Sequence, residues 1–210
     1  LTSTCTFQIT FAPAADYFPL TQNSSWTYDN ALLPDSLYKL STTTTTIGAN
    51  TCRIFSIGLG AVGTNPLASA SFRKSGSDFF EYMSVDSFTN VTFDAPVRGD
   101  IPFLQEAAPV GTNWESAEFT GTESGLPVKI KYAFNLASSG GTHVVNGITF
   151  SNVKKVSWKS RVDYNNTGYQ DELQMESYYA LGVGLIDFRI TDAGSTTWFS
   201  EDHIRSYLVN

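Results

Sequence analysis

The stretch LPVKIKYAFNL, residues 126–136, decides the fold class. Apolar residues occupy every second position from Leu126 to Leu136, and Pro127, Lys129, Lys131, Ala133 and Asn135 alternate with them. A period of two places successive side chains on opposite faces of a β-strand. Eleven residues without a break in this pattern therefore predict a long strand that buries one face.

The segments that follow repeat the pattern. Apolar residues alternate over 148–162, and Val153 falls out of phase, which predicts a β-bulge. Asn146-Gly147, just before this segment, predicts a type I′ hairpin turn. A third alternating strand covers 173–181, and Gly182 and Gly184 then permit a sharp bend. Consecutive strands of this kind are expected to pair as a meander.

The rest of the chain is also typical of β structure, and the only helical turn that we expect covers 103–108. Further strands are expected at 26–28, 36–47, 51–57, 68–74, 78–85, 90–93, 113–120, 185–191, 196–199 and 204–209. The predicted fold class is all-β, or α+β with one or two short helices. We expect one domain over 1–210, a large antiparallel meander curled into a half-barrel or barrel-like sandwich, with 1–20 as a lead-in segment or edge strand.

Composition limits the function classes. Of 210 residues, 41% are hydrophobic and only 16% charged, which excludes a disordered chain and a coiled coil. No apolar run is long enough for a transmembrane helix. The net charge of −7 argues against nucleic acid as a partner. The low charge and the many Ser and Thr residues are typical of an exported protein. Export is inferred from this composition and not from a signal peptide, which the sequence does not show.

The two cysteines, Cys5 and Cys52, lack the CxxC spacing of redox and zinc motifs. We favour a disulfide between them, because the composition fits an exported protein. The alternative is two unrelated buried thiols.

A search for catalytic and metal-binding patterns assigns no catalytic residue, metal or cofactor. The loop from Asp163 resembles the start of a calcium loop, but its last position is Gln174, where a bidentate Glu is expected. Glu172 and Glu176 share a strand face at a spacing too wide for glycosidase chemistry. The only histidines are His143 and His203, and carboxylates clustered around either would favour a hydrolase. We predict that the protein is not an enzyme.

Aromatic residues make up 14% of the chain and suggest a ligand surface. A curled sheet without covering helices would enclose an apolar interior, expected at roughly 300–1,000 Å³. The candidate ligand-binding residues lie on the alternating strands, and they are Trp158, Tyr179, Tyr132 and Phe134.

Two motifs resemble those of a known group of proteins. Residues 16–20 (DYFPL) and 23–28 (NSSWTY) resemble the YFPL…GxxWtY opening of exported bacterial β-domains, and 178–186 (YYALGVGLI) resembles their YYAxGVGLI motif. These are uncharacterised secreted proteins or lipoproteins of Gram-negative envelopes. Some of them are similar to the lipoprotein-localisation-factor (LolA- and LppX-like) superfamily, whose curled sheet holds an apolar cavity. Asn23 stands where the family often has Gly, and no lipobox precedes Cys5.

The resemblance implies an extracytoplasmic protein of the periplasm, the outer-membrane surface or the secreted fraction. Its expected function is non-enzymatic binding of an apolar or amphiphilic small molecule, or of a lipid-modified partner. The alternative is a cell-surface interaction or adhesion module that binds glycan or protein without a cavity. An open apolar interior would favour the first function, and a filled interior would favour the second.

Overall fold

The computed structural model describes residues 16–210, and within them it contains thirteen β-strands and no helix, which confirms the all-β prediction. In this part of the chain there is no helix that could cross a bilayer. In chain order the strands are β1 (Ser25–Asp29), β2 (Leu37–Ile47), β3 (Asn50–Leu59), β4 (Pro66–Ser75), β5 (Asp78–Ser84), β6 (Arg98–Gln105), β7 (Asn113–Glu115), β8 (Phe119–Glu123), β9 (Leu126–Val145), β10 (Ile148–Tyr164), β11 (Gln170–Ala180), β12 (Gly184–Asp192) and β13 (Ser200–Leu208).

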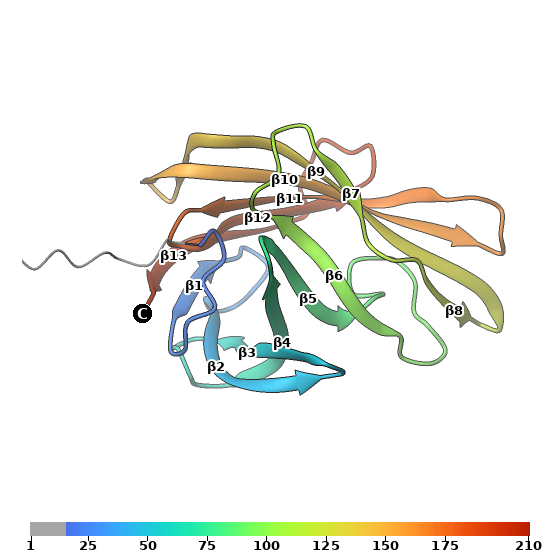
Figure 1. Cartoon of the computed structure of the whole chain (residues 1–210), viewed down its shortest axis with the longest axis horizontal. Helices are drawn as coiled ribbons and strands as arrows, with labels where there is room; N and C mark the ends of the chain where they lie inside the picture. The colour runs from blue at the N-terminus through green and yellow to red at the C-terminus, as the bar shows by residue number, and fades with distance from the viewer. Residues whose placement is uncertain (1–15) are drawn as a thin grey trace, which may run out of the picture.

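All thirteen strands form one antiparallel sheet that curls into a nearly closed barrel (Figure 1). The hydrogen-bonded order is β6-β5-β4-β3-β2-β1-β13-β12-β11-β10-β9-β7, and β8 also pairs with β9. The two ends of the sheet meet where the Trp114 indole N–H of β7 donates to the Pro102 carbonyl of β6 at 2.6 Å. The predicted curled meander is confirmed, and curvature rather than a helical layer covers its apolar face.

Strand β9 shows the predicted alternation as alternating burial. Five of its inward-facing residues are at most 2% exposed, namely Val128, Ile130, Tyr132, Phe134 and Leu136. The predicted hairpin turn is confirmed, because Asn146 and Gly147 both have positive φ and Val145 pairs with Ile148. The register of β10 also shifts on both sides of Val153, as the predicted bulge requires.

Three local predictions are wrong, and packing explains two of them. Residues 103–105 continue strand β6 with Leu104 fully buried, and the turn that follows is not helical. Residues 90–93 form a loop, although Val91 and Phe93 are buried like strand residues. Residues 196–199 form the loop before β13. Leu104, Val91 and Phe93 are thus buried in the core, but the backbone of 103–108 and 90–93 adopts neither the expected helical turn nor the expected strand.

The two family-like motifs lie against each other, although about 150 residues separate them. The Trp26 indole N–H donates to the Val183 carbonyl at 2.5 Å, and the Tyr28 hydroxyl donates to the Leu185 carbonyl at 3.0 Å. Gly184 has a φ of 107°, and a Cβ there would lie 3.2 Å from the Trp26 ring nitrogen. The bend between β11 and β12 is thus the surface on which the amino-terminal motif packs.

Residues 1–15 of the predicted lead-in lie outside the described residues. Residues 16–20 form no strand, and they place Phe18 among the rings inside the barrel. Cys52 on β3 is 1% exposed, and Cys5 lies outside the described residues. The Cys5–Cys52 disulfide therefore stays a prediction.

Gly58 on β3 is required by a close approach, which gives a first testable prediction. A Cβ at this position would lie 2.4 Å from the Asn65 carbonyl oxygen and 2.6 Å from the hydroxyl of the buried Tyr38. We expect Gly58→Ala to lower the free energy of unfolding in urea by about 2 kcal/mol, because the backbone carbonyl cannot move aside cheaply. Gly141→Ala is the control, since no atom lies within 4 Å of its added Cβ, and it should change stability little. Equal effects of the two variants would contradict the prediction.

Candidate functional site

The interior of the barrel contains an apolar cavity of about 190 Å³. Its wall is formed mainly by aromatic side chains from both halves of the sheet and from the segments that enter it. The lining residues are Phe18, Lys39, Phe72, Glu81, Met83, Phe88, Ile101, Phe103, Phe134, Trp158, Ser177, Tyr179, Leu185, Phe188 and Asp202.

The long strands β9, β10 and β11 position one wall of the cavity. Trp158 stacks on Phe134 with ring centroids 5.5 Å apart, and these residues are paired across β10 and β9. The Trp158 indole N–H donates to the Ser177 hydroxyl at 3.0 Å. This hydrogen bond satisfies the buried indole and fixes the ring, so the wall is formed before any ligand arrives.

The structure brings three of the four predicted ligand-binding residues together. Trp158, Tyr179 and Phe134 line the cavity. Tyr132 is fully buried behind Trp158, with its ring 5.8 Å away, and its hydroxyl donates to the Val85 carbonyl at 2.8 Å. Tyr132 therefore supports the wall from behind, outside the set of lining residues.

Phe18 and Phe103 also line the cavity, and their rings occupy part of the barrel interior. The Phe18 ring lies 5.0 Å from Phe103, 4.9 Å from Phe72 and 6.3 Å from Tyr179. The cavity is consequently smaller than the 300–1,000 Å³ expected from the sequence. Sequence reasoning missed Phe18 because its segment has no strand periodicity.

Three charged residues face this mostly apolar space. Burial raises the pKa of the Glu81 carboxyl to about 7, while the Lys39 charge acts in the opposite direction. Among the described residues neither Glu81 nor Lys39 has an ion-pair partner. Asp202 accepts a hydrogen bond from the Asn30 amide at 2.6 Å. The cavity thus offers an apolar body and a few polar groups, the combination found in small-molecule sites.

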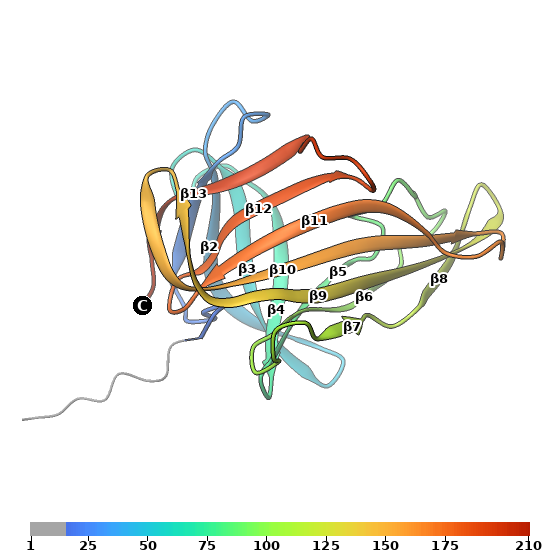
Figure 2. The same ribbon diagram turned by 90° about the horizontal axis from the view of Figure 1, so that it is seen from above.

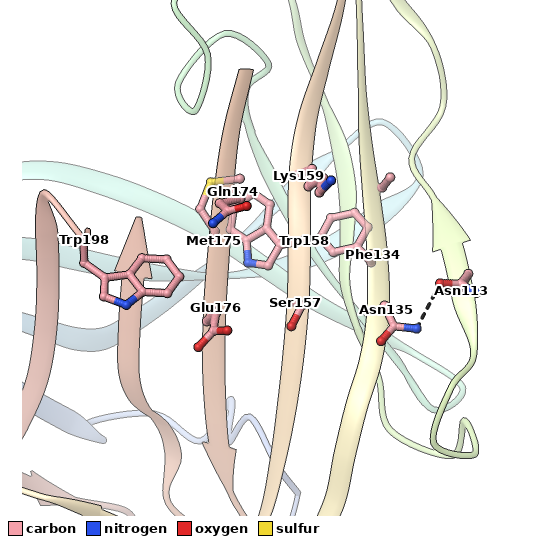
Figure 3. Close-up of a pocket in the computed structure, with 11 residues that line it drawn as sticks. Asn113, Phe134, Asn135, Ser157, Trp158, Lys159, Gln174, Met175, Glu176 and Trp198 are labelled. Carbon is pink, nitrogen blue, oxygen red and sulfur yellow. Dashed lines mark hydrogen bonds between the residues drawn. The ribbon is translucent and has the colours of Figure 1, made fainter. Parts of the chain in front are cut away.

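A second depression of about 370 Å³ lies on the outer face of the barrel (Figure 3). Its floor includes outward-facing side chains of β7, β9, β10 and β11, and Trp198 from the β12–β13 loop lies over one side. The polar lining residues are Asn113, Asn135, Ser157, Lys159, Gln174 and Glu176. Six of the eleven residues that line this outer groove are polar, a larger share than in the interior cavity.

Both histidines of the chain meet on one buried carboxylate, Asp187 of β12. His143 Nε2 lies 2.7 Å and His203 Nδ1 lies 2.8 Å from its two oxygens, and Arg189 donates to it at 3.0 Å. His143 comes from the β9–β10 hairpin, which bends back toward β13 at its tip (Figure 2). Among residues 16–210 no hydroxyl or thiol is hydrogen-bonded to either imidazole, as an activated nucleophile would be. The observed arrangement therefore joins the hairpin to the barrel wall.

The calcium-like loop also has a structural explanation. Asp163 is 6% exposed, and its carboxylate accepts a hydrogen bond from the Gly168 amide at 2.9 Å. Asn165 and Asn166 both have positive φ, which is typical of a tight turn built from Asn. The side chain of Asp163 closes the turn that leads into β11.

The comparisons with known proteins identify the fold. No family model matches the chain, and no curated protein matches it in sequence. A candidate lipoprotein from Parabacteroides distasonis ATCC 8503 has a similar crystal structure, with 11% identity and a TM-score of 0.57 over 94% of this chain and 100% of that one. A candidate exported protein with a YmcC-like fold, from Bacteroides fragilis NCTC 9343, has 11% identity and a TM-score of 0.53 over 92% of this chain and 99% of that one.

These likenesses concern the fold alone, because the identities are so low. The barrel is consistent with the LolA-like architecture implied by the sequence resemblance. Membership of the family with the two motifs stays a prediction. The chain has the fold of these two bacterial proteins, and its interior cavity and outer groove are two candidate ligand sites.

Proposed function

We propose that this protein is a non-enzymatic extracytoplasmic binding protein that holds an apolar or amphiphilic small molecule inside the barrel. The observation that carries the proposal is the interior cavity, whose wall is aromatic and already fixed by hydrogen bonds such as Trp158 to Ser177. The export and lipoprotein descriptions of the two structural neighbours support a location outside the cytoplasm.

The size and chemistry of the cavity restrict the ligand. A dry cavity of about 150 Å³ in another protein accommodates benzene, so 190 Å³ suits a ligand not much larger than one or two rings, or a short alkyl chain. Glu81 and Lys39 have no ion-pair partner among the described residues, and they can meet a polar end of the ligand. An amphiphile with a small head therefore fits better than a purely apolar molecule.

Titration with 1-naphthylamine, a neutral two-ring dye whose emission increases at shorter wavelengths in apolar surroundings, tests the proposal. We expect the dye signal to rise with the folded protein. Leu185→Trp should weaken binding by about tenfold or more, because Leu185 lines the cavity and the larger ring would fill it. Circular dichroism would establish that the variant is folded.

Leu67→Trp is the matched control, since Leu67 is 67% exposed and does not line the cavity. It should bind the dye like the wild type. Absence of a dye signal with folded protein would refute the proposal, and so would unchanged binding by Leu185→Trp. Either result would leave the interaction-module alternative.

A further inference from the structure

The outer groove contains a row of polar side chains that crosses four strands. Glu176 of β11 pairs with Ser157 of β10, Ser157 pairs with Asn135 of β9, and Asn135 pairs with Asn113 of β7. Directly paired residues point to the same face, and this face is opposite to the buried one. With strands about 4.8 Å apart, the row is about 14 Å long. Figure 3 shows these four side chains in sequence across the sheet.

Trp198 forms a wall at one end of this row, and its loop is held in place. The Gln174 side-chain amide donates to the Ser195 carbonyl at 2.8 Å, and the Ala193 amide donates to the Glu172 carbonyl at 2.7 Å. The Trp198 side chain is half-buried, and within residues 16–210 its indole N–H has no hydrogen-bond acceptor. A fixed aromatic ring with a free donor is thus presented beside the polar row.

The charges in the groove are already compensated. Glu176 pairs with Lys155 at 2.6 Å, and Lys159 pairs with Asp171 at 2.6 Å. What remains for a ligand is neutral hydrogen bonding. The Asn135 amide donates to the Asn113 side-chain oxygen at 2.9 Å, which leaves the Asn135 oxygen available, and the Ser157 hydroxyl has no partner among the described residues.

We propose that the outer groove binds a neutral linear oligosaccharide, with one sugar ring stacked on Trp198 and hydroxyl groups bonded along the row from Glu176 to Asn113. A row of this length fits several sugar units better than a single one. Sugar rings present apolar C–H faces to an aromatic ring and hydroxyls at their edges, which matches a ring wall beside a polar floor. This site lies on the opposite face of β9 and β10 from the interior cavity, and it does not depend on the function proposed for that cavity.

The test uses the hexasaccharides of maltose, cellulose, laminarin, mannan and xylan as probes, in a nuclear magnetic resonance titration of the ¹⁵N-labelled protein. The other three indole N–H groups all donate to protein oxygens inside the fold. We therefore expect at least one probe to shift the indole signal of Trp198 and to leave the other three almost unchanged. Trp198→Ala should weaken that binding by about tenfold, which is the contribution of one aromatic contact.

Two further variants separate binding from folding. Phe199→Ala is the control, because Phe199 is an exposed aromatic neighbour that does not line the groove, and it should bind like the wild type. Ser157→Val keeps a good strand residue, removes the central hydroxyl and should weaken binding. The proposal is wrong if no probe shifts the Trp198 signal at millimolar concentration, or if Phe199→Ala loses as much affinity as Trp198→Ala. Unchanged dye binding inside the barrel would show that such a failure concerns this groove alone.

Discussion

Asp187→Ala is expected to lower the free energy of unfolding by about 3 kcal/mol, because it leaves three cationic or polar partners without their buried carboxylate. Asp187 is 1% exposed, and it lies within 3.0 Å of groups from His143, His203 and Arg189. The side chains of these partners are 19–30% exposed, so water can satisfy part of what is lost. The effect should therefore fall at the lower end of the 3–5 kcal/mol typical of broken buried ion pairs.

The loss should be concentrated in the β9–β10 hairpin. His143 is its main polar attachment to β12, while Asn146 at its tip donates to the Ile204 carbonyl at 3.1 Å. Urea unfolding would measure the global change, and hydrogen exchange should show faster exchange for amides of residues 141–153.

Asp171→Ala is the control, because Asp171 pairs with Lys159 and Arg161 on the outer face of the barrel and its side chain is 33% exposed. That variant should lose less than about 1 kcal/mol. Equal losses in the two variants would contradict a special role for Asp187.

The fold could be predicted from sequence because its information is local. The alternation over 126–136 fixes which face of β9 is buried. The Asn146-Gly147 turn fixes the register in which β9 pairs with β10. Curvature followed from the absence of helices to cover so much apolar surface. What periodicity could not give was the pairing of β1 with β13, which joins the two halves of the sheet, since that contact brings together the two ends of the chain.

The candidate site was predicted only where it lies on regular strands. Trp158, Tyr179 and Phe134 follow from alternation, and all three line the cavity. Phe18 enters from a segment without periodicity, so no pattern could place it. Glu81 shares the parity of the buried Phe79 and Met83 on β5, so alternation alone indicates that it faces the inside of the barrel.

The Asp187 cluster shows the same limit. His143 and Asp187 lie 44 positions apart, and only the bending of the hairpin brings them within hydrogen-bond distance. The outer groove depends likewise on the β12–β13 loop that carries Trp198. Contacts of this kind depend on tertiary packing, which single-strand patterns do not encode.

Glu81→Gln is expected to stabilise the protein at alkaline pH by up to about 3 kcal/mol. Burial raises the pKa of Glu81 from its ordinary value of 4.5 to about 7, so the folded state disfavours the ionised carboxylate. Each pK unit corresponds to about 1.4 kcal/mol. A carboxyl that costs stability inside an apolar cavity is typical of a residue retained for binding, which is consistent with the proposed ligand site.

The sign of the pH dependence is fixed by which state binds more protons. Between pH 4.5 and about 7 the folded protein retains the Glu81 proton that the unfolded chain loses, so this residue makes stability fall as pH rises. Glutamine resembles the protonated acid, and the variant should match the wild type below pH 4.5 and exceed it increasingly up to about pH 7. Urea unfolding across this range would measure the difference between the two free energies of unfolding.

Glu115→Gln is the control, because the Glu115 side chain is 46% exposed on the outer face of the barrel, and its stability should show no comparable pH trend. A stability difference for Glu81→Gln that does not change with pH would show that the wild-type carboxyl ionises without penalty inside the barrel.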